Sequence, residues 1–215
     1  DILDAQDRIA EAFAAYGASK ALQRDQFAPA MEGLESVRAR EIRLGEYFRR
    51  IAVWPGAQHH GDARTHVFLV GFPRSGTTLL EQVLAAHPDV MAMQERACLM
   101  DSAAAFFGAD ADLDRLAGLT DDALEPWRAA YWKRVAETEL GLTKPVFVDK
   151  MPLNAVFLPL IARLFPQAKI LLALRDPRDV VLSCFRRRFA ARRTASAPAS
   201  AVAELGVVNP PPPRP

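Results

Sequence analysis

Short apolar runs alternate with helix-like patterns between residues 66 and 185. The runs cover residues 66–70, 90–93, 145–150 and 168–174, and segments whose apolar positions recur every three or four residues follow them. Short apolar runs predict buried strands, whereas the wider spacing predicts helices with one apolar face. Strands that alternate with helices form parallel sheets covered by helices on both faces. The pattern therefore predicts a three-layer α/β fold in which helices flank a central parallel sheet.

The run at residues 168–174 is apolar throughout, apart from its lysine near the start. A parallel strand without polar alternation is typically covered on both faces, so we expect this strand in the middle of the sheet. Residues 97–141 predict two or three helices, with an acidic loop at residues 108–114. We interpret the aromatic positions Trp127 and Tyr131 in this segment as packing rather than as a binding pocket.

The two ends of the chain differ in pattern from the middle. Residues 1–53 have helical periodicity, with Phe13 and Tyr16 on one face, and residues 54–61 indicate a linker. A basic run from residue 186 precedes Ala-, Ser- and Pro-rich sequence that cannot build a core. We therefore expect three parts: a helical N-terminal extension with its linker at 1–61, an α/β domain at 62–189 and a disordered tail at 190–215.

The most informative local motif is the glycine loop, the segment G-x-x-x-x-G-T-T from Gly71 to Thr78. A predicted strand precedes it and a helix follows, so backbone N–H groups and the positive end of the helix dipole face the loop. A nucleotide kinase loop would place lysine where Thr77 stands, whereas here the cation is Arg74, whose guanidinium can fork onto an oxyanion. We predict anion binding, the alternative being a structural turn. The predicted contacts are Arg74, Ser75, Gly76, Thr77 and Thr78.

Charged residues follow the other predicted strands at their carboxyl ends. Ligands of open parallel sheets bind at that edge, so Glu95, Lys150 and Arg175 are candidates for one site. A lysine there can stabilise charge on an oxygen that leaves during group transfer, and a glutamate can accept a proton. The alternatives are a helix N-terminal acid for Glu95 and a surface lysine paired with Asp149 for Lys150.

The segment PRSGTTL, residues 73–79, resembles the 5′-phosphosulfate loop of sulfotransferases that use 3′-phosphoadenosine-5′-phosphosulfate (PAPS). Its arginine form, followed by His-Pro-Asp-Val at residues 87–90, is most similar to the branch that contains tyrosylprotein sulfotransferases and bacterial sulfotransferases with helical repeats. Arg175 and Ser183 have the spacing R-x₇-S, which resembles the element that holds the donor's 3′-phosphate in this family.

The resemblance implies sulfuryl transfer from PAPS to a hydroxyl acceptor, which could be a protein tyrosine, a sugar or a small alcohol or phenol. It matches Glu95 to the family's general base and Lys150, within DKMPLN, to its catalytic lysine. Arg74 would join Lys150 in stabilising the leaving oxygen. The implied fold is of the P-loop type, and we expect it to be incomplete at the C-terminus, because the family's elements after residue 186 have no counterpart here.

Two rival functions stay open. A P-loop kinase or nucleotide hydrolase would need a phosphate-binding lysine and a Mg²⁺-binding acid, for which Asp149 is the candidate. An inactive sulfotransferase fragment is the second rival, because the C-terminal elements of the family are missing. The first residue is Asp1 rather than Met, so we expect the chain to be part of something longer.

Composition narrows the range of partners. The 215 residues carry a formal net charge of +1, which gives no general reason to expect nucleic-acid binding. No segment approaches the roughly 18 unbroken apolar residues of a membrane-spanning helix. Two cysteines are too few for a disulfide framework and favour a reducing, cytoplasmic compartment. We expect no metal, since His59 and His60 have no evident third ligand.

Overall fold

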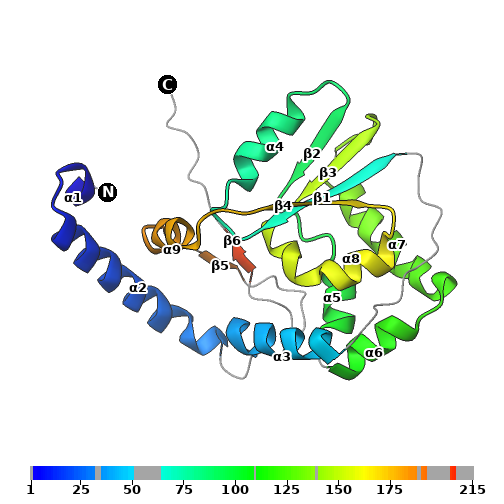
Figure 1. Ribbon diagram of the computed structural model, residues 1–215, viewed down its shortest axis with the longest axis horizontal. Helices are drawn as coiled ribbons and strands as arrows, with labels where there is room; N and C mark the ends of the chain where they lie inside the picture. Colours follow the sequence, from blue (N-terminus) through cyan, green and yellow to red (C-terminus); the bar gives the residue numbers. More distant parts are fainter. Residues whose placement is uncertain are drawn as a thin grey trace. The chain divides into compact units, whose positions relative to one another are not determined.

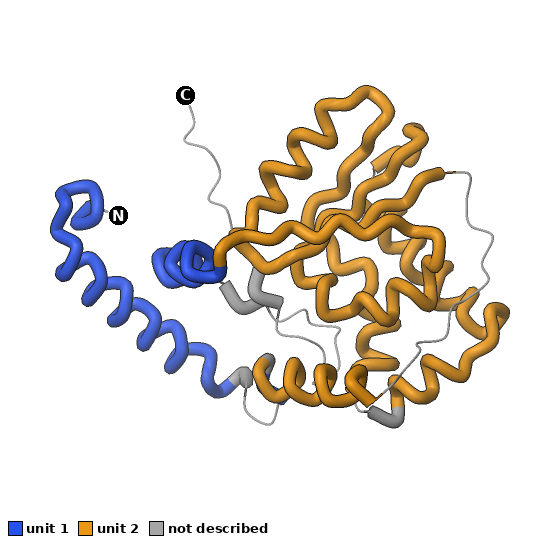
Figure 2. Tube along the Cα trace, in the orientation of Figure 1, with its two compact units in different colours: residues 1–36, 177–215 blue, residues 37–176 orange. Residues whose placement is uncertain are grey.

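The computed structural model describes residues 2–31, 35–50, 64–108, 110–138, 140–187, 190–192 and 204–206. The chain divides into two compact units, the sheet unit (residues 37–176) and the terminal unit (residues 1–36 with 177–215), as Figure 2 shows. The predicted linker lies outside the described residues, as does most of the predicted tail. The described parts of that tail are two short antiparallel strands, β5 (Ala190–Arg192) and β6 (Glu204–Gly206). The predicted domain boundaries stay a prediction.

A four-stranded parallel sheet forms the centre of the sheet unit (Figure 1). Its strands are β1 (Thr65–Gly71), β2 (Val90–Gln94), β3 (Val146–Lys150) and β4 (Lys169–Ala173), in the order β2-β3-β1-β4. Because all of them are parallel, their carboxyl ends lie at one edge of the sheet. The predicted α/β fold with a central parallel sheet is confirmed.

Helices cover both faces of this sheet (Figure 1). On one face, Leu80 and Leu84 of α4 (Thr77–Ala85) pack against a buried core contributed by β1, β2 and β3. On the other face, Tyr131 of α7 (Asp121–Ala136) has its ring centroid 6.0 Å from that of Phe68 in β1. A 3₁₀ helix (Pro152–Phe157) and α8 (Leu158–Leu164) follow β3 on the side of α7. These are the three layers that the alternating pattern predicts.

Three more helices belong to the sheet unit: α3 (Val37–Arg50), α5 (Met100–Phe106) and α6 (Asp110–Gly118). The Tyr47 hydroxyl of α3 donates a hydrogen bond of 2.7 Å to Asp114 Oδ1 of α6. Because α6 begins at Asp110, most of the acidic loop predicted at residues 108–114 is helical, and that prediction is wrong. Leu113 and Leu116 are completely buried, and the aspartates around them hide this helical spacing in the sequence.

From its apolar run we predicted that β4 lies in the middle of the sheet. That prediction is wrong, because β4 is an edge strand. Among the described residues it pairs only with β1, and Ile170, Leu171 and Leu172 are 42%, 37% and 52% exposed. An apolar run shows that a strand is suited to burial. Strand order depends instead on the crossover connections, which the run does not encode.

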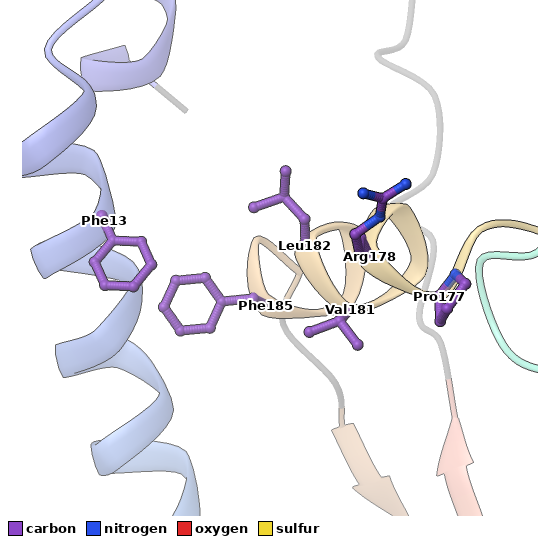
Figure 3. Close-up of a pocket in the computed structure, with 6 residues that line it drawn as sticks. All are labelled: Phe13, Pro177, Arg178, Val181, Leu182 and Phe185. Carbon is purple, nitrogen blue, oxygen red and sulfur yellow. The ribbon is translucent and has the colours of Figure 1, made fainter.

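The terminal unit contains α1 (Ile2–Ala5), α2 (Ile9–Met31) and α9 (Pro177–Phe185) among its described residues. Phe13 and Tyr16 of α2 contact the Phe185 ring, with centroids 5.0 and 6.0 Å apart, so this predicted helix face packs against α9. An apolar hollow of about 570 Å³ lies beside the contact (Figure 3). Its lining consists of Phe13, Pro177, Arg178, Val181, Leu182 and Phe185. Within the described parts of the chain, no helix has the length and apolar character needed to cross a membrane.

Candidate active site

The glycine loop turns from β1 into α4 at the carboxyl edge of the sheet. A Cβ atom on Gly71 would lie 2.7 Å from the Ala173 carbonyl oxygen and 2.9 Å from Ser75 Oγ, so the close approach of β1 to β4 requires glycine. Gly76, the N-cap residue of α4, has φ 99°, and within the described part of the chain it makes no side-chain cap hydrogen bond. The first N–H groups of α4 are therefore available to an anion, as the sequence predicts.

Ser75 has a structural partner inside the loop. Its backbone N–H and its hydroxyl both donate to the Phe72 carbonyl oxygen, at 3.1 and 2.7 Å. These bonds close the turn that brings the N–H groups of Gly76, Thr77 and Thr78 to the start of α4. The anion contact predicted for Ser75 stays a prediction, and the structure gives that residue a second role in shaping the loop.

Two residues at this edge have a left-handed backbone although they are not glycine. Arg74 has φ 73° and Glu95 has φ 46°, and among the described residues only Asp7 shares this feature. Such conformations cost roughly 1–3 kcal/mol each and cluster at functional sites, where the fold holds side chains in set directions. Strain at two of the three predicted catalytic positions, Arg74 and Glu95, supports a functional role for this end of the sheet.

Arg175 follows β4 and reaches the glycine loop. Its Nη1 donates a hydrogen bond of 3.4 Å to the carbonyl oxygen of Arg74. The Arg175 side chain, which follows β4, thus contacts the backbone of the glycine loop, which follows β1. Ser183 lies in α9 and belongs to the terminal unit, so the R-x₇-S element stays a prediction.

Lys150 ends β3 and is fully buried between two glutamates. Its Nζ lies 2.8 Å from Glu95 Oε1 and 3.1 Å from Glu81 Oε2. The backbone of Glu95 is fixed to the same strand, because its N–H donates to the Lys150 carbonyl oxygen at 2.8 Å. The structure therefore brings Lys150 and Glu95 together, and the alternative of a surface lysine paired with Asp149 is wrong. Glu95 also lies before α5 begins at Met100, outside the first turn of any described helix.

Sequence reasoning missed Glu81. The apolar positions of α4 suggest that Leu79, Leu80, Val83 and Leu84 face the core, yet Leu79 and Val83 are 68% and 63% exposed. The inward face instead carries Thr77, Leu80, Glu81 and Leu84. An acid between two core leucines was the available signal, because an ionisable side chain on a buried helix face needs a partner.

A second buried cluster lies on the opposite face of the sheet. The Tyr131 hydroxyl donates to Asp149 Oδ2 at 2.9 Å, and His66 Nε2 lies 3.0 Å from the same hydroxyl. Burial raises the pKa of Asp149 to about 7, although the bond from Tyr131 opposes this shift, and burial lowers the pKa of His66 to about 3. Asp149 therefore faces α7 and not the glycine loop, which removes the Mg²⁺ ligand of the kinase rival. The described residues contain no group of three His, Cys, Asp or Glu suited to a metal ion.

Replacing Asp149 with asparagine should change how stability depends on pH. The raised pKa of Asp149 means that its favourable contribution is present at low pH and is lost as pH rises from about 4 to about 7. The lowered pKa of His66 acts in the opposite sense, since its contribution is lost as pH falls from about 6.5 towards 3. Asp149→Asn removes only the first effect. The free energy of unfolding of the parent chain should therefore fall by about 2 kcal/mol more than that of the variant when pH rises from 5 to 8.

Urea unfolding at pH 5 and pH 8 measures this difference. Asp122→Asn, which removes an exposed acid from the first turn of α7, is the matched control and should show no such change. An equal effect of Asp149→Asn on the free energy of unfolding at both pH values would contradict the assignment.

The arrangement of the glycine loop, Lys150 and Glu95 agrees with the family to which the sequence matches. The model of the sulfotransferase family matches residues 66–206, which include the sheet, the glycine loop and the Lys150–Glu95 pair. The chain belongs to the sulfotransferase family. The resemblance drawn from the sequence motifs is confirmed.

Several curated relatives match the sulfotransferase part of the chain. It is 35% identical over 127 residues to protein-tyrosine sulfotransferase 1 of Mus musculus, which covers 57% of this chain and 34% of the mouse protein. It is 32% identical over 127 residues to protein-tyrosine sulfotransferase 1 of Danio rerio, covering 57% and 36%. An uncharacterized protein of Aquifex aeolicus (strain VF5) is 32% identical over 134 residues, covering 59% and 17%. The chain thus spans less than half the length of the curated relatives it matches.

Proposed function

We propose that this protein transfers a sulfuryl group from PAPS to a hydroxyl acceptor. The observation that carries the proposal is the arrangement at the carboxyl edge of the sheet, where Lys150 Nζ lies 2.8 Å from Glu95 Oε1. Lys150 ends β3, which pairs with the strand before the glycine loop, and Glu95 follows β2, which pairs with β3. Family membership supports a sulfonate donor. The cytoplasm is the proposed location, on the basis of cysteine content.

The donor's two anionic ends would meet different groups of the chain. The N–H groups of Gly76, Thr77 and Thr78 at the uncapped start of α4 would bind the 5′-phosphosulfate, in the manner of a P-loop. The guanidinium of Arg74, which lies within the loop, would donate two parallel hydrogen bonds to the same phosphosulfate. Arg175, which already contacts the loop at Arg74, would hold the 3′-phosphate together with Ser183.

In the chemical step, Glu95 would take the proton of the acceptor hydroxyl as the acceptor oxygen forms its bond to sulfur. The bond between sulfur and the bridging oxygen breaks, and the electron pair stays on that oxygen. Lys150, assisted by Arg74, would stabilise the resulting charge. A sulfuryl group carries less negative charge than a terminal phosphoryl group, so the two cations of the chain can serve where a kinase uses a metal.

A tyrosine hydroxyl is the first acceptor to test, because relatives with 32–35% identity are named protein-tyrosine sulfotransferases. Sugars and small alcohols or phenols are the other candidates. Each candidate acceptor is incubated with the chain and PAPS labelled in its sulfuryl group. The acceptor that becomes labelled identifies the acceptor class.

Thermal unfolding of the full chain tests the donor assignment. Adenosine 3′,5′-bisphosphate at a hundred times its Kd should stabilise the chain by about 2.7 kcal/mol, which raises Tm by several degrees. ATP with Mg²⁺ should have a much smaller effect, because the chain offers no Walker lysine and Asp149 faces the other side of the sheet. Stabilisation by ATP with Mg²⁺ that equals or exceeds that of the bisphosphate would favour the kinase rival. No stabilisation by either would favour an inactive fragment.

A further inference from the structure

The feature that the proposed reaction leaves unexplained is the second carboxylate beside Lys150. Glu81 projects from the second turn of α4, and its side chain is only 12% exposed. Its Oε2 lies 3.1 Å from Lys150 Nζ, yet this oxygen receives no hydrogen bond of good geometry within the described part of the chain. The separation is that of an ion pair, whereas the directed hydrogen bond of the ammonium goes to Glu95 Oε1.

The surroundings of Lys150 show why one carboxylate would not suffice. Glu95 faces it from the end of β2, Glu81 faces it from α4, and its neighbours in register on β1 and β2 are Leu69 and Gln94, which carry no charge. Asp149 points to the other face of the sheet, where it accepts a bond from Tyr131. A buried ammonium is stable only while an anionic partner remains close to it.

The proposed reaction removes one of these partners. When Glu95 takes the acceptor's proton, it becomes neutral and no longer balances the charge of Lys150. Among the described residues, Glu81 is then the remaining carboxylate within ion-pair distance of Lys150. An ammonium group has three N–H donors, so it can turn one towards Glu81 while another reaches the bridging oxygen.

We propose that Glu81 is a positioning residue, which holds the Lys150 ammonium at the carboxyl end of β3 while Glu95 accepts the proton. The proposal rests on the proposed sulfuryl transfer and adds Glu81 to the three ionisable side chains of its chemical step, Glu95, Lys150 and Arg74. Glu81 touches neither donor nor acceptor in this scheme and acts only through Lys150.

A double-mutant cycle between Glu81→Gln and Lys150→Ala tests the proposal. Glu81→Gln alone should lower kcat by about tenfold or more, with KM for the donor and Tm largely retained, because the amide keeps the volume but not the charge. In the Lys150→Ala background the same change should alter kcat by less than about twofold, since no ammonium remains to be positioned. A control, Glu41→Gln, changes an exposed glutamate of α3 and should leave kcat unchanged.

The cycle has a second readout that does not depend on catalysis. Lys150→Ala leaves Glu81 and Glu95 facing each other without a cation, so adding Glu81→Gln should raise the Tm of that variant. If the unmodified chain neither binds the bisphosphate nor transfers a sulfuryl group, the proposed function is wrong. Independently of that result, the ion pair is contradicted if adding Glu81→Gln does not raise the Tm of Lys150→Ala. If the unmodified chain is active but Glu81→Gln lowers kcat by equal factors in both backgrounds, or changes only KM, the positioning role is wrong.

Discussion

Lys150→Ala should lower kcat for sulfuryl transfer by about two to four decades, while the Kd for adenosine 3′,5′-bisphosphate stays largely unchanged. The reason is that the Lys150 ammonium, at the carboxyl end of β3, is needed when charge develops on the bridging oxygen. In the proposed function the glycine loop and Arg175 bind the phosphates, and Lys150→Ala alters neither of them. Steady-state kinetics at saturating donor, together with calorimetric binding of the bisphosphate, separate these two quantities.

The control for this substitution is Lys169→Ala. Lys169 is exposed and is the first residue of β4, so it lies at the amino ends of the strands, away from the site at their carboxyl ends. The same change of residue type should therefore leave kcat intact. Lys150→Ala also removes the cation between two glutamates, and its Tm should be recorded so that loss of folded protein is not counted as loss of catalysis. Strong loss of bisphosphate affinity with unchanged turnover at saturation would contradict the catalytic assignment.

The positions that the candidate site residues take in the structure follow from local pattern and from strand adjacency. A strand, a glycine loop and a helix in succession give the uncapped start of α4, and the adjacency of parallel strand ends brings Glu95 and Lys150 to one edge. The pairing of strands then brings residues that are distant in the sequence close together at the carboxyl ends of the sheet. Arg175 reaches the loop for this reason, since β4 pairs with β1.

The parts that the sequence does not predict depend on which face a side chain takes. In α4, the pairs Leu79–Val83 and Leu80–Leu84 have the same spacing, and only packing on the sheet selects the second pair and buries Glu81 with it. In β3, successive side chains point to opposite faces, yet the pattern does not say which face Asp149 takes and which Lys150 takes. The bond from Tyr131 to Asp149 required knowledge of which helix covers that face.

The edge position of β4 shows the same limit at the level of the sheet. Apolar content predicts burial, yet Leu172 is 52% exposed among the described residues. Strand order follows from crossovers, and several orders are compatible with one alternating pattern of strands and helices.

Glu95→Gln should lower kcat by about two to four decades with an acceptor of ordinary phenolic acidity. Glutamine keeps an oxygen that can accept the hydrogen bond from Lys150 Nζ, so the ammonium retains a partner on this side and Tm should change little. What the amide cannot do is take the acceptor's proton. The substitution therefore separates the proposed role of Glu95 as a base from its ion pair with Lys150, whereas alanine would remove both together.

An acidic phenol that is already ionised at the assay pH makes this test decisive, because such an acceptor has no proton to give. Glu95→Gln should then lose much less activity than it loses with an ordinary phenol, whereas Lys150→Ala should lose activity with both, since the bridging oxygen still leaves. Glu41→Gln again serves as the exposed control. An equal loss in Glu95→Gln for both acceptors would show that Glu95 holds Lys150 in place without acting as the base, and the assignment of proton transfer to this residue would be wrong.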